Sequence, residues 1–226
     1  PAQRWPGANA MIAGKDLQAG GSWMGVDASG RFAAVTNFRE LEQGPADARS
    51  RGELVTDYLL GDTPAESYLA GLAERANHYR GYNLLLADGG ELYCASNRDV
   101  SIRRLQPGVH GVCNGPMDSD WPKVKRGRQL LAKAVDHTEP EPEQLFALLG
   151  DQTQPADEAL PDTGVGLEWE RLLGTISIDG AIAGKGYGTR SASVLLLDAQ
   201  GRGQFVEQSR MDDASWRQRE FSIEPS

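Results

Sequence analysis

The chain has 226 residues, with 23 lysine plus arginine and 32 aspartate plus glutamate side chains, so its formal net charge is −9. An acidic chain of this kind argues against a nucleic-acid-binding protein and against binding to anionic membranes, because both need clusters of basic residues. No apolar run reaches the roughly 18 residues of a membrane span, so we expect a globular protein, placed by default in the cytoplasm.

The first half of the chain predicts a hairpin, two helices and a second hairpin. Residues 24–35 and 84–93 each place an apolar run on either side of a short turn that contains Asp and Gly, which is typical of an antiparallel hairpin. Between them, residues 50–53 and 63–66 have the S/T-x-x-E form of a capping box, so we expect a helix to begin at each. In the second helix Pro64 should be the first helical residue, and the helix should end near residue 79.

The second half predicts helices over 121–135 and 141–149, a third hairpin over 194–206 and a last strand over 220–223. Residues 151–166 are rich in Pro, Gly and acidic residues and predict a long surface loop or lid, a kind of segment that is often functional. This order of hairpins and helices favours an α+β layered fold with antiparallel sheets.

Histidine and cysteine residues form no recognisable chemical motif. His78, His110 and His137 lie far apart in the sequence, so we interpret each as a surface residue. Cys94 and Cys113 are too few for a disulfide framework and lack the spacing of a zinc site. We expect two reduced core thiols and no metal.

Three polar residues lie at the ends of apolar stretches. Asn37 closes a predicted strand, Asn114 follows a short strand expected over 111–113, and Arg190 precedes the third hairpin. Strand ends present groups to a cleft, where an Asn amide or an Arg can donate to an oxyanion or a carboxylate. The alternative is that the two Asn residues serve turn geometry and that Arg190 makes a surface ion pair.

Several sequence blocks, in order along essentially the whole chain, are similar to one known family. They are residues 20–26, 36–39, 50–55, 81–84, 111–116, 121–123, 160–165 and 187–191. They resemble the NRDE family, also called the transport and Golgi organisation protein 2 family. The resemblance implies a single domain over 1–226 with the four-layer αββα sandwich of N-terminal-nucleophile hydrolases. Pro1 is similar to the proline that follows the family's naming motif, so we expect the chain to lack the family's first strand, that motif and its N-terminal Cys.

A weaker similarity extends to the cysteine acylases of the penicillin V acylase and bile salt hydrolase group. Residues 25–37, 114–121 and Arg190 resemble their oxyanion hairpin, their Asn-x-Pro loop and their late active-site arginine. If the protein is an enzyme, this resemblance implies that Asn37 is an oxyanion donor, Asn114 a positioning residue and Arg190 an electrostatic stabiliser.

Three functions remain open at this point. Family members are linked to haem trafficking and to acyl-coenzyme A or lipid handling, which implies a binding and trafficking factor for a small molecule such as haem. The ligand-binding residues implied are Arg190, Asn37, Asn114, Trp121 and Tyr187, with the cysteines and histidines as candidate iron ligands. The first alternative is an N-terminal-nucleophile cysteine amidohydrolase whose Cys precedes Pro1. The second is a non-catalytic domain whose acidic loop 151–166 binds a basic protein partner.

Overall fold

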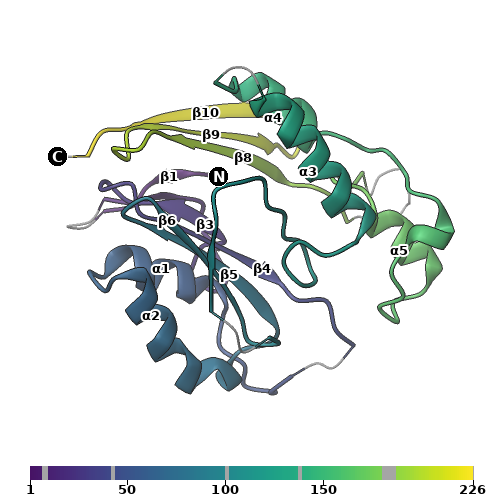
Figure 1. The fold of residues 1–226 in the computed structure, drawn as a ribbon, viewed down its shortest axis with the longest axis horizontal. Helices are drawn as coiled ribbons and strands as arrows, with labels where there is room; N and C mark the ends of the chain where they lie inside the picture. The colour runs from purple at the N-terminus through teal and green to yellow at the C-terminus, as the bar shows by residue number, and fades with distance from the viewer. Residues whose placement is uncertain (7–9, 42–43, 100–101, 137–138, 180–186, 226) are drawn as a thin grey trace.

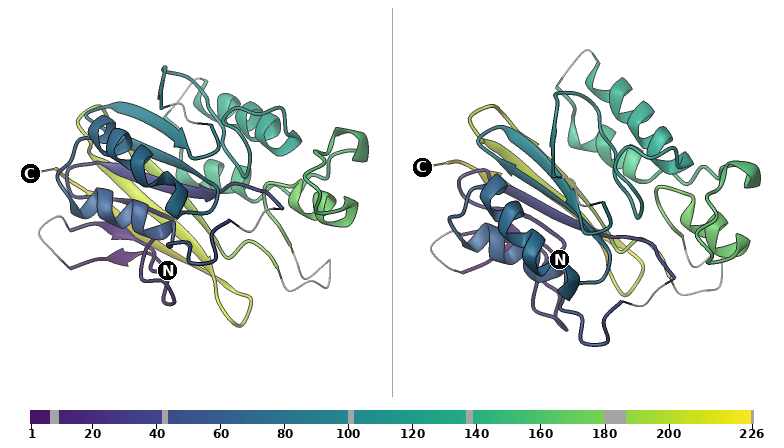
Figure 2. Two further views of the ribbon diagram at one scale, coloured as in Figure 1. Left: turned by 90° about the horizontal axis from the view of Figure 1, so that it is seen from below. Right: turned by 60° about the horizontal axis from the view of Figure 1, so that its bottom comes forward.

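The computed structural model describes residues 1–6, 10–41, 44–99, 102–136, 139–179 and 187–225. Within these residues the chain forms a seven-stranded sheet, a three-stranded sheet and five α-helices. All the strand pairs are antiparallel, which confirms the α+β class. The two sheets are stacked, with helices α1 and α2 outside the larger sheet and α3 and α4 outside the smaller one (Figures 1 and 2).

The larger sheet follows the order of the chain from its first strand to its last. Its strands are β1 (Gln3–Arg4), β2 (Ile12–Ala13), β3 (Met24–Val26), β4 (Phe32–Asn37), β5 (Tyr82–Asp88), β6 (Glu91–Ser96) and β7 (Arg103–Leu105). The β3–β4 and β5–β6 pairs confirm the first two predicted hairpins. β4 and β5 also pair directly, with Asn37 opposite Tyr82. The ends of both hairpins therefore lie side by side.

The smaller sheet consists of β8 (Ser191–Leu197), β9 (Gly203–Arg210) and β10 (Trp216–Ile223), in the order β10-β9-β8. The β8–β9 pair confirms the third hairpin, and the predicted strand 220–223 is the end of the longer β10. Apolar side chains from both sheets form the layer between them: Ala2, Ile12, Val26, Phe205 and Ile223.

Helices α1 (Gly52–Leu60) and α2 (Ala65–Leu72) cover the outer face of the larger sheet, where Leu54, Leu72 and Leu84 belong to one buried cluster. Burial of such side chains contributes about 1.5–3 kcal/mol each, which fixes both helices on the sheet. Close approach also ties α1 to the start of β3. A Cβ at Gly21 would lie 2.4 Å from the carbonyl carbon of Gly52, so only glycine fits there.

The starts of these two helices differ from the prediction, because neither has a capping box. In α1 the Glu53 carboxylate pairs with Arg49 at 2.7 Å instead of turning back toward Ser50. In α2 Pro64 is the N-cap residue, and the first helical N–H, of Ala65, donates to the carboxylate of Asp88 at 3.2 Å. That acceptor comes from the neighbouring hairpin, which no local pattern could show. The second predicted helix also ends early and continues as the 3₁₀ helix η1 (Ala73–His78).

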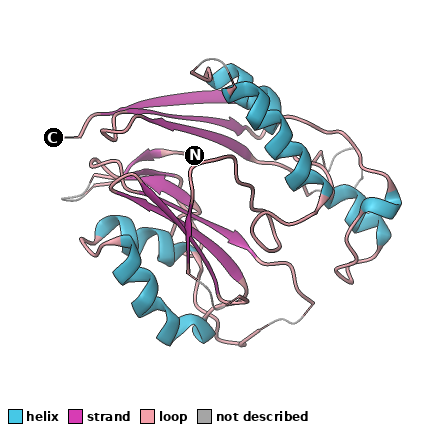
Figure 3. Cartoon of the chain, viewed as in Figure 1, coloured by secondary structure: helices cyan, strands magenta, loops and turns pink. Residues whose placement is uncertain are grey.

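Helices α3 (Pro122–Val135) and α4 (Pro142–Leu149) agree with the prediction to within one residue at each end. Figure 3 shows where helices, strands and loops lie along the chain. Phe146 of α4 packs with Val194 and Val206 on the outer face of the smaller sheet. No helix in the described part of the chain is both long and apolar enough to cross a membrane.

The predicted loop 151–166 is irregular except for the 3₁₀ helix η2 (Asp157–Ala159), and it leads into α5 (Leu167–Leu173), which the sequence did not predict. Two carboxylates of this loop already form ion pairs with arginines of the same chain, so they are not available to a basic partner. Arg126 donates twice to Asp151, at 2.7 and 2.6 Å, and lowers the pKa of that carboxyl to about 2. Asp157 is paired with Arg171 in the same way.

Candidate functional site

The chain around Asn114 lies against the end of β4 and the start of β5, where two side chains hold it. Asn83 is 1% exposed, and its Nδ2 donates to the carbonyl oxygens of Cys113 at 3.2 Å and Gly115 at 2.9 Å. The Thr36 hydroxyl donates to the same Cys113 oxygen at 2.7 Å. The strand predicted just before Asn114 is therefore wrong: the segment is held by the side chains of Asn83 and Thr36 and not by a neighbouring strand.

Asn37 and Asn114, both predicted as site residues, lie next to each other. Asn114 Nδ2 donates to the backbone oxygen of Asn37 at 3.0 Å, and the backbone oxygen of Asn114 accepts from the N–H of Arg39 at 2.6 Å. The Asn114 amide nitrogen is therefore engaged. The Asn37 side chain is exposed, and no described residue hydrogen-bonds it. Within the described residues, the Asn37 amide keeps both of its N–H groups for a bound group, whereas the Asn114 amide has used one of its two.

Both asparagines line a cavity of about 320 Å³, together with Tyr187, a third predicted site residue. Three arginines that the sequence did not single out line the same cavity: Arg39, Arg51 and Arg80. We call it the arginine cavity. It brings the end of β4, the start of α1 and the start of β5 together with the chain around Asn114.

Arg39 is the buried member of this set, with a side chain 9% exposed. Its Nη1 lies 2.7 Å from Oε2 of Glu170 on α5, and the Trp121 ring centroid is 5.0 Å from its guanidinium carbon. Glu170 Oε1 accepts the N–H and hydroxyl of Thr163 at 2.8 and 2.5 Å. Predicted site residue Trp121 thus reaches the cavity through Arg39. Arg39 Nη2 is buried and has no hydrogen-bond partner among the described residues.

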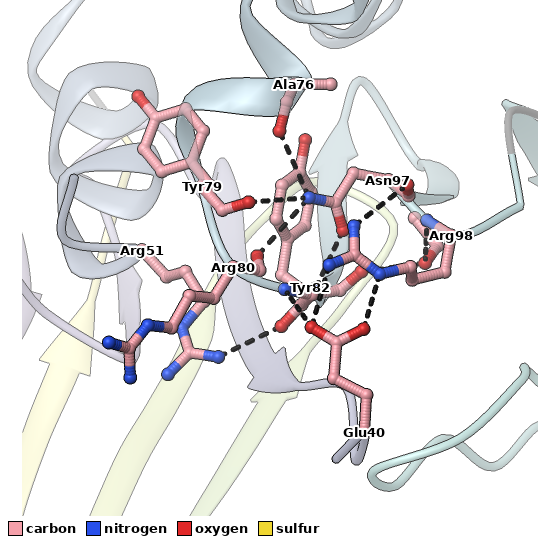
Figure 4. Close-up of polar contacts among 10 residues, drawn as sticks. Glu40, Arg51, Ala76, Tyr79, Arg80, Tyr82, Asn97 and Arg98 are labelled. Carbon is pink, nitrogen blue, oxygen red and sulfur yellow. Dashed lines mark hydrogen bonds and ion pairs between the residues drawn. The ribbon is translucent and has the colours of Figure 1, made fainter. Parts of the chain in front are cut away.

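Arg51 and Arg80 lie next to each other, as Figure 4 shows. Arg51 Nη1 donates to the Gly81 oxygen at 2.9 Å, and its pKa is lowered first by burial and then by the neighbouring Arg80 guanidinium. One acid, Glu40, lines the same cavity, and other partners occupy its oxygens. It accepts from Arg98 at 2.5 and 2.7 Å and from the Gly81 N–H at 3.0 Å, bonds that lower the Glu40 pKa.

One side chain places the backbone that carries Arg80. Asn97 Nδ2 donates to the oxygens of Ala76 at 3.1 Å, Tyr79 at 3.3 Å and Arg80 at 3.2 Å, while Asn97 Oδ1 accepts the Tyr82 N–H at 2.9 Å (Figure 4). No local sequence signal marks Asn97, because polar residues commonly follow a strand.

A second cavity, of about 470 Å³, lies between α3, α4, β8 and the segment 110–113. We call it the apolar cavity, because most of its wall is aliphatic: Val112, Val124, Leu131, Leu145, Leu148, Leu149, Ile176, Val194 and Leu195. Cys113 and Lys123 also line it, and Lys123 Nζ lies 3.4 Å from Asn114 Oδ1, between the two cavities. Burial lowers the pKa of Lys123.

The two thiols are free but not alike. Cys94 is buried, as predicted, and burial raises the pKa of its thiol to about 11. Cys113 is only partly buried and lines the apolar cavity, so the interpretation of Cys113 as a core thiol is wrong. Among the described residues no group of three or more His, Cys, Asp or Glu side chains could hold a metal ion.

His110, which lines the apolar cavity, is not a simple surface residue. Its Nδ1 lies 2.8 Å from Asp118 Oδ2, and its Nε2 lies 2.8 Å from the Gln106 oxygen. Both partners only accept hydrogen bonds, so the ring satisfies both when it is doubly protonated. The Asp118 bond and then the Gln106 bond raise the His110 pKa. His78 is exposed, as predicted, and His137 lies outside the described residues.

Arg190 directly precedes β8, but it belongs to neither cavity wall. Its side chain is 73% exposed, and its Nη2 lies 3.8 Å from Asp212 Oδ1. Of the five predicted site residues, the structure brings Asn37, Asn114 and Tyr187 together, adds Trp121 through Arg39, and leaves Arg190 outside.

The sequence matches known proteins along nearly all of its length. The profile of the family described as "Transport and Golgi organisation 2" matches residues 1–212. The chain is 32% identical over 234 residues to the "Transport and Golgi organization protein 2 homolog" of Homo sapiens, which covers 97% of this chain and 84% of that protein. It is 31% identical over 221 residues to the Mus musculus homolog, covering 92% and 80%. The Drosophila melanogaster protein is 26% identical over 227 residues, also covering 92% and 80%.

Proposed function

The chain belongs to the transport and Golgi organisation 2 family, and we propose that it binds and carries a small amphipathic anion, with haem and acyl-coenzyme A as the two candidate classes. One observation carries the proposal: an apolar cavity and an arginine cavity lie on either side of the consecutive residues Cys113 and Asn114. A ligand with an apolar body and acidic groups matches this pair of linings.

The apolar cavity suits the body of such a ligand. Its volume of about 470 Å³ lies within the range of roughly 300–1,000 Å³ that is usual for small-molecule sites. An aliphatic wall accepts an acyl chain or the face of a porphyrin and disfavours a charged head group, whose desolvation would not be compensated. The head group is therefore expected on the side of Lys123 and the arginines.

A haem ligand would find few iron ligands here. Cys94 lies in β6, buried and outside the cavity wall, and the described partners of His110 occupy both of its ring nitrogens. The Cys113 thiol is the remaining candidate at the apolar cavity. Haem held mainly by its ring face and its propionates would dissociate readily, as carriage requires.

Filling the apolar cavity tests the proposal. Gly127 lies on α3 in the cavity wall, and the nearest atom to a Cβ built there is Ile176 Cδ1 at 3.7 Å, so a leucine side chain would enter the cavity. The matched control is Gly71→Leu on α2, where nothing lies within 4 Å of the added Cβ.

We expect Gly127→Leu to weaken binding of ferric haem or palmitoyl-coenzyme A by about tenfold or more, because overpacking costs about 1–3 kcal/mol. Gly71→Leu should bind as the wild type does. The measurements are the shift of the haem absorption band and calorimetric titration. If the wild type binds neither ferric haem nor palmitoyl-coenzyme A at micromolar concentration, the proposal is overturned.

A second candidate function is amide hydrolysis by an N-terminal cysteine. It is favoured by the unengaged Asn37 amide at the cavity and by the helix–sheet–sheet–helix order, which is similar to that of N-terminal-nucleophile hydrolases. A chain extended by the family's N-terminal segment should then hydrolyse an acyl amide, and Asn37→Ala should slow it by about 10²- to 10³-fold. Turnover that persists after the N-terminal Cys is changed to Ala would exclude this mechanism.

A further inference from the structure

We propose that Arg51 and Arg80 form a subsite for a doubly charged oxyanion. The chemical class is two negative charges on neighbouring oxygens, supplied either by the phosphates of a nucleotide-type head group or by two carboxylates of a porphyrin. The inference deepens the proposed function and rests on it for the apolar remainder of the ligand.

The first argument is the balance of charge. Two neighbouring arginines each have an acid: Arg39 has Glu170 at 2.7 Å, and Arg49 has Glu53 at 2.7 Å. No described residue forms an ion pair with Arg51 or Arg80. Glu40 attracts Arg51 only at longer range, because Arg98 and the Gly81 N–H occupy its oxygens.

The second argument is that the two like charges are held together. The Gly81 oxygen accepts from Arg51, and Asn97 binds the backbone oxygen of Arg80. Figure 4 shows the two guanidinium groups side by side, away from the Glu40–Arg98 pair. The two guanidinium groups repel each other, so their electrostatic energy is unfavourable in this arrangement. An anion bound between them would attract both and make the electrostatic energy of the site favourable.

The third argument is the chemistry of the surrounding wall. Guanidinium groups bind phosphate and carboxylate oxygens in a bidentate way. The Asn37 amide, with no described partner, can add a further donor from the same cavity. A single carboxylate would neutralise one arginine of the pair, and a dianion neutralises both.

The test uses inorganic pyrophosphate as the probe and titration calorimetry as the measurement. Arg80 is exposed, so Arg80→Gln should fold normally, which thermal unfolding checks. The matched control is Arg217→Gln on β10, which removes the same charge from an exposed arginine that lines neither cavity.

We expect Arg80→Gln to weaken pyrophosphate binding by about tenfold or more, since it removes a charge-assisted bidentate contact. Arg217→Gln should change it by less than about twofold, and Arg80→Lys should fall between, because lysine keeps the charge without the fork. Equal effects of Arg80→Gln and Arg217→Gln would overturn the inference. Wild-type protein that binds neither pyrophosphate nor a dicarboxylate porphyrin would overturn it as well.

The source of the charges follows from a second pair of titrations, with coenzyme A and with ferric mesoporphyrin. A loss in Arg80→Gln confined to coenzyme A identifies phosphate, and a loss confined to the porphyrin identifies paired carboxylates; either supports the subsite. Pyrophosphate binding that depends on Arg80, with no binding of any amphipathic ligand, would support the subsite and overturn the carrier function. If Gly127→Leu weakens binding of an amphipathic ligand and Arg80→Gln does not, the carrier function is supported and the subsite is overturned.

Discussion

The two cavities on either side of Cys113 and Asn114 are built in different ways. The arginine cavity lies among loops that follow strand ends, and buried hydrogen bonds and an ion pair hold its wall. The apolar cavity lies between helix faces and a strand, and aliphatic packing forms its wall. The first wall should therefore be sensitive to the loss of single polar partners, and the second to changes in volume.

The largest loss of stability is expected from Glu170→Leu, which should disturb the wall of the arginine cavity and leave the apolar cavity unchanged. The pair with Arg39 is buried, with side chains 9% and 4% exposed, and the change would leave the guanidinium without its acid. Removing one partner of a buried pair costs about 3–5 kcal/mol. Urea unfolding measures the loss. The control is Glu168→Leu on the exposed face of the same helix, for which we expect about 0.5 kcal/mol or less; similar losses in both variants would contradict the prediction.

Asn83→Ala should have the next largest effect, because it acts on both cavities at once. The change leaves the Gly115 oxygen without its buried donor, whereas the Cys113 oxygen keeps its bond from the Thr36 hydroxyl. At about 1–3 kcal/mol for an unsatisfied buried group, the free energy of unfolding should fall by about 1–3 kcal/mol. Hydrogen exchange should rise across residues 111–116. Asn37→Ala, which removes an exposed amide with no described partner, should change stability little, and unchanged exchange in Asn83→Ala would argue against a shared wall.

A smaller effect of pH should arise on the apolar side, at His110. Asp118 faces this ring, and the Arg128 guanidinium of α3 lies 3.5 Å from Asp118. The native pKa of His110 is raised by its Asp118 bond. The native state therefore holds its proton to higher pH than the unfolded state, and the stabilisation is complete below the unfolded pKa of about 6.5.

That stabilisation is lost as the pH rises through the native pKa of His110. The free energy of unfolding of the wild type, minus that of His110→Asn, should accordingly be largest in mild acid and decline toward alkaline pH. Denaturant unfolding at a series of pH values measures it. A difference that stays flat or grows with pH would contradict a raised native pKa of His110.

Local patterns predicted the elements whose determinants are local. Three hairpins and helices α3 and α4 follow from turn residues and apolar spacing. The predicted start of α2 was wrong because the acceptor of its first N–H, Asp88, is distant in sequence. The seven-residue helix α5 is too short for its apolar period to stand out.

The site divides in the same way. Asn37 and Asn114 were found because they follow apolar stretches, and pairing of β4 with β5 brings their surroundings together. Arg190 also lies at a strand end, but its strand belongs to the other sheet and its side chain points to Asp212. Arg51 lies in residues 50–55, one of the blocks that resemble the family. Residues 50–53 were interpreted as a capping box that begins a helix, so Arg51 was not predicted to be a site residue. Arg80 has no motif, and only the fold places it beside Arg51.

The position of Asn83 has a consequence for how a ligand would leave. Asn83 binds the carbonyls on both sides of Asn114, so we expect a ligand that displaces this segment from one cavity to move the wall of the other. Thermodynamic linkage then requires the coupling to be reciprocal. If a bound anion changes the affinity for the apolar body by some factor, the bound apolar body changes the affinity for the anion by the same factor. Loss of the head-group contacts would then weaken binding of the apolar body by that same factor.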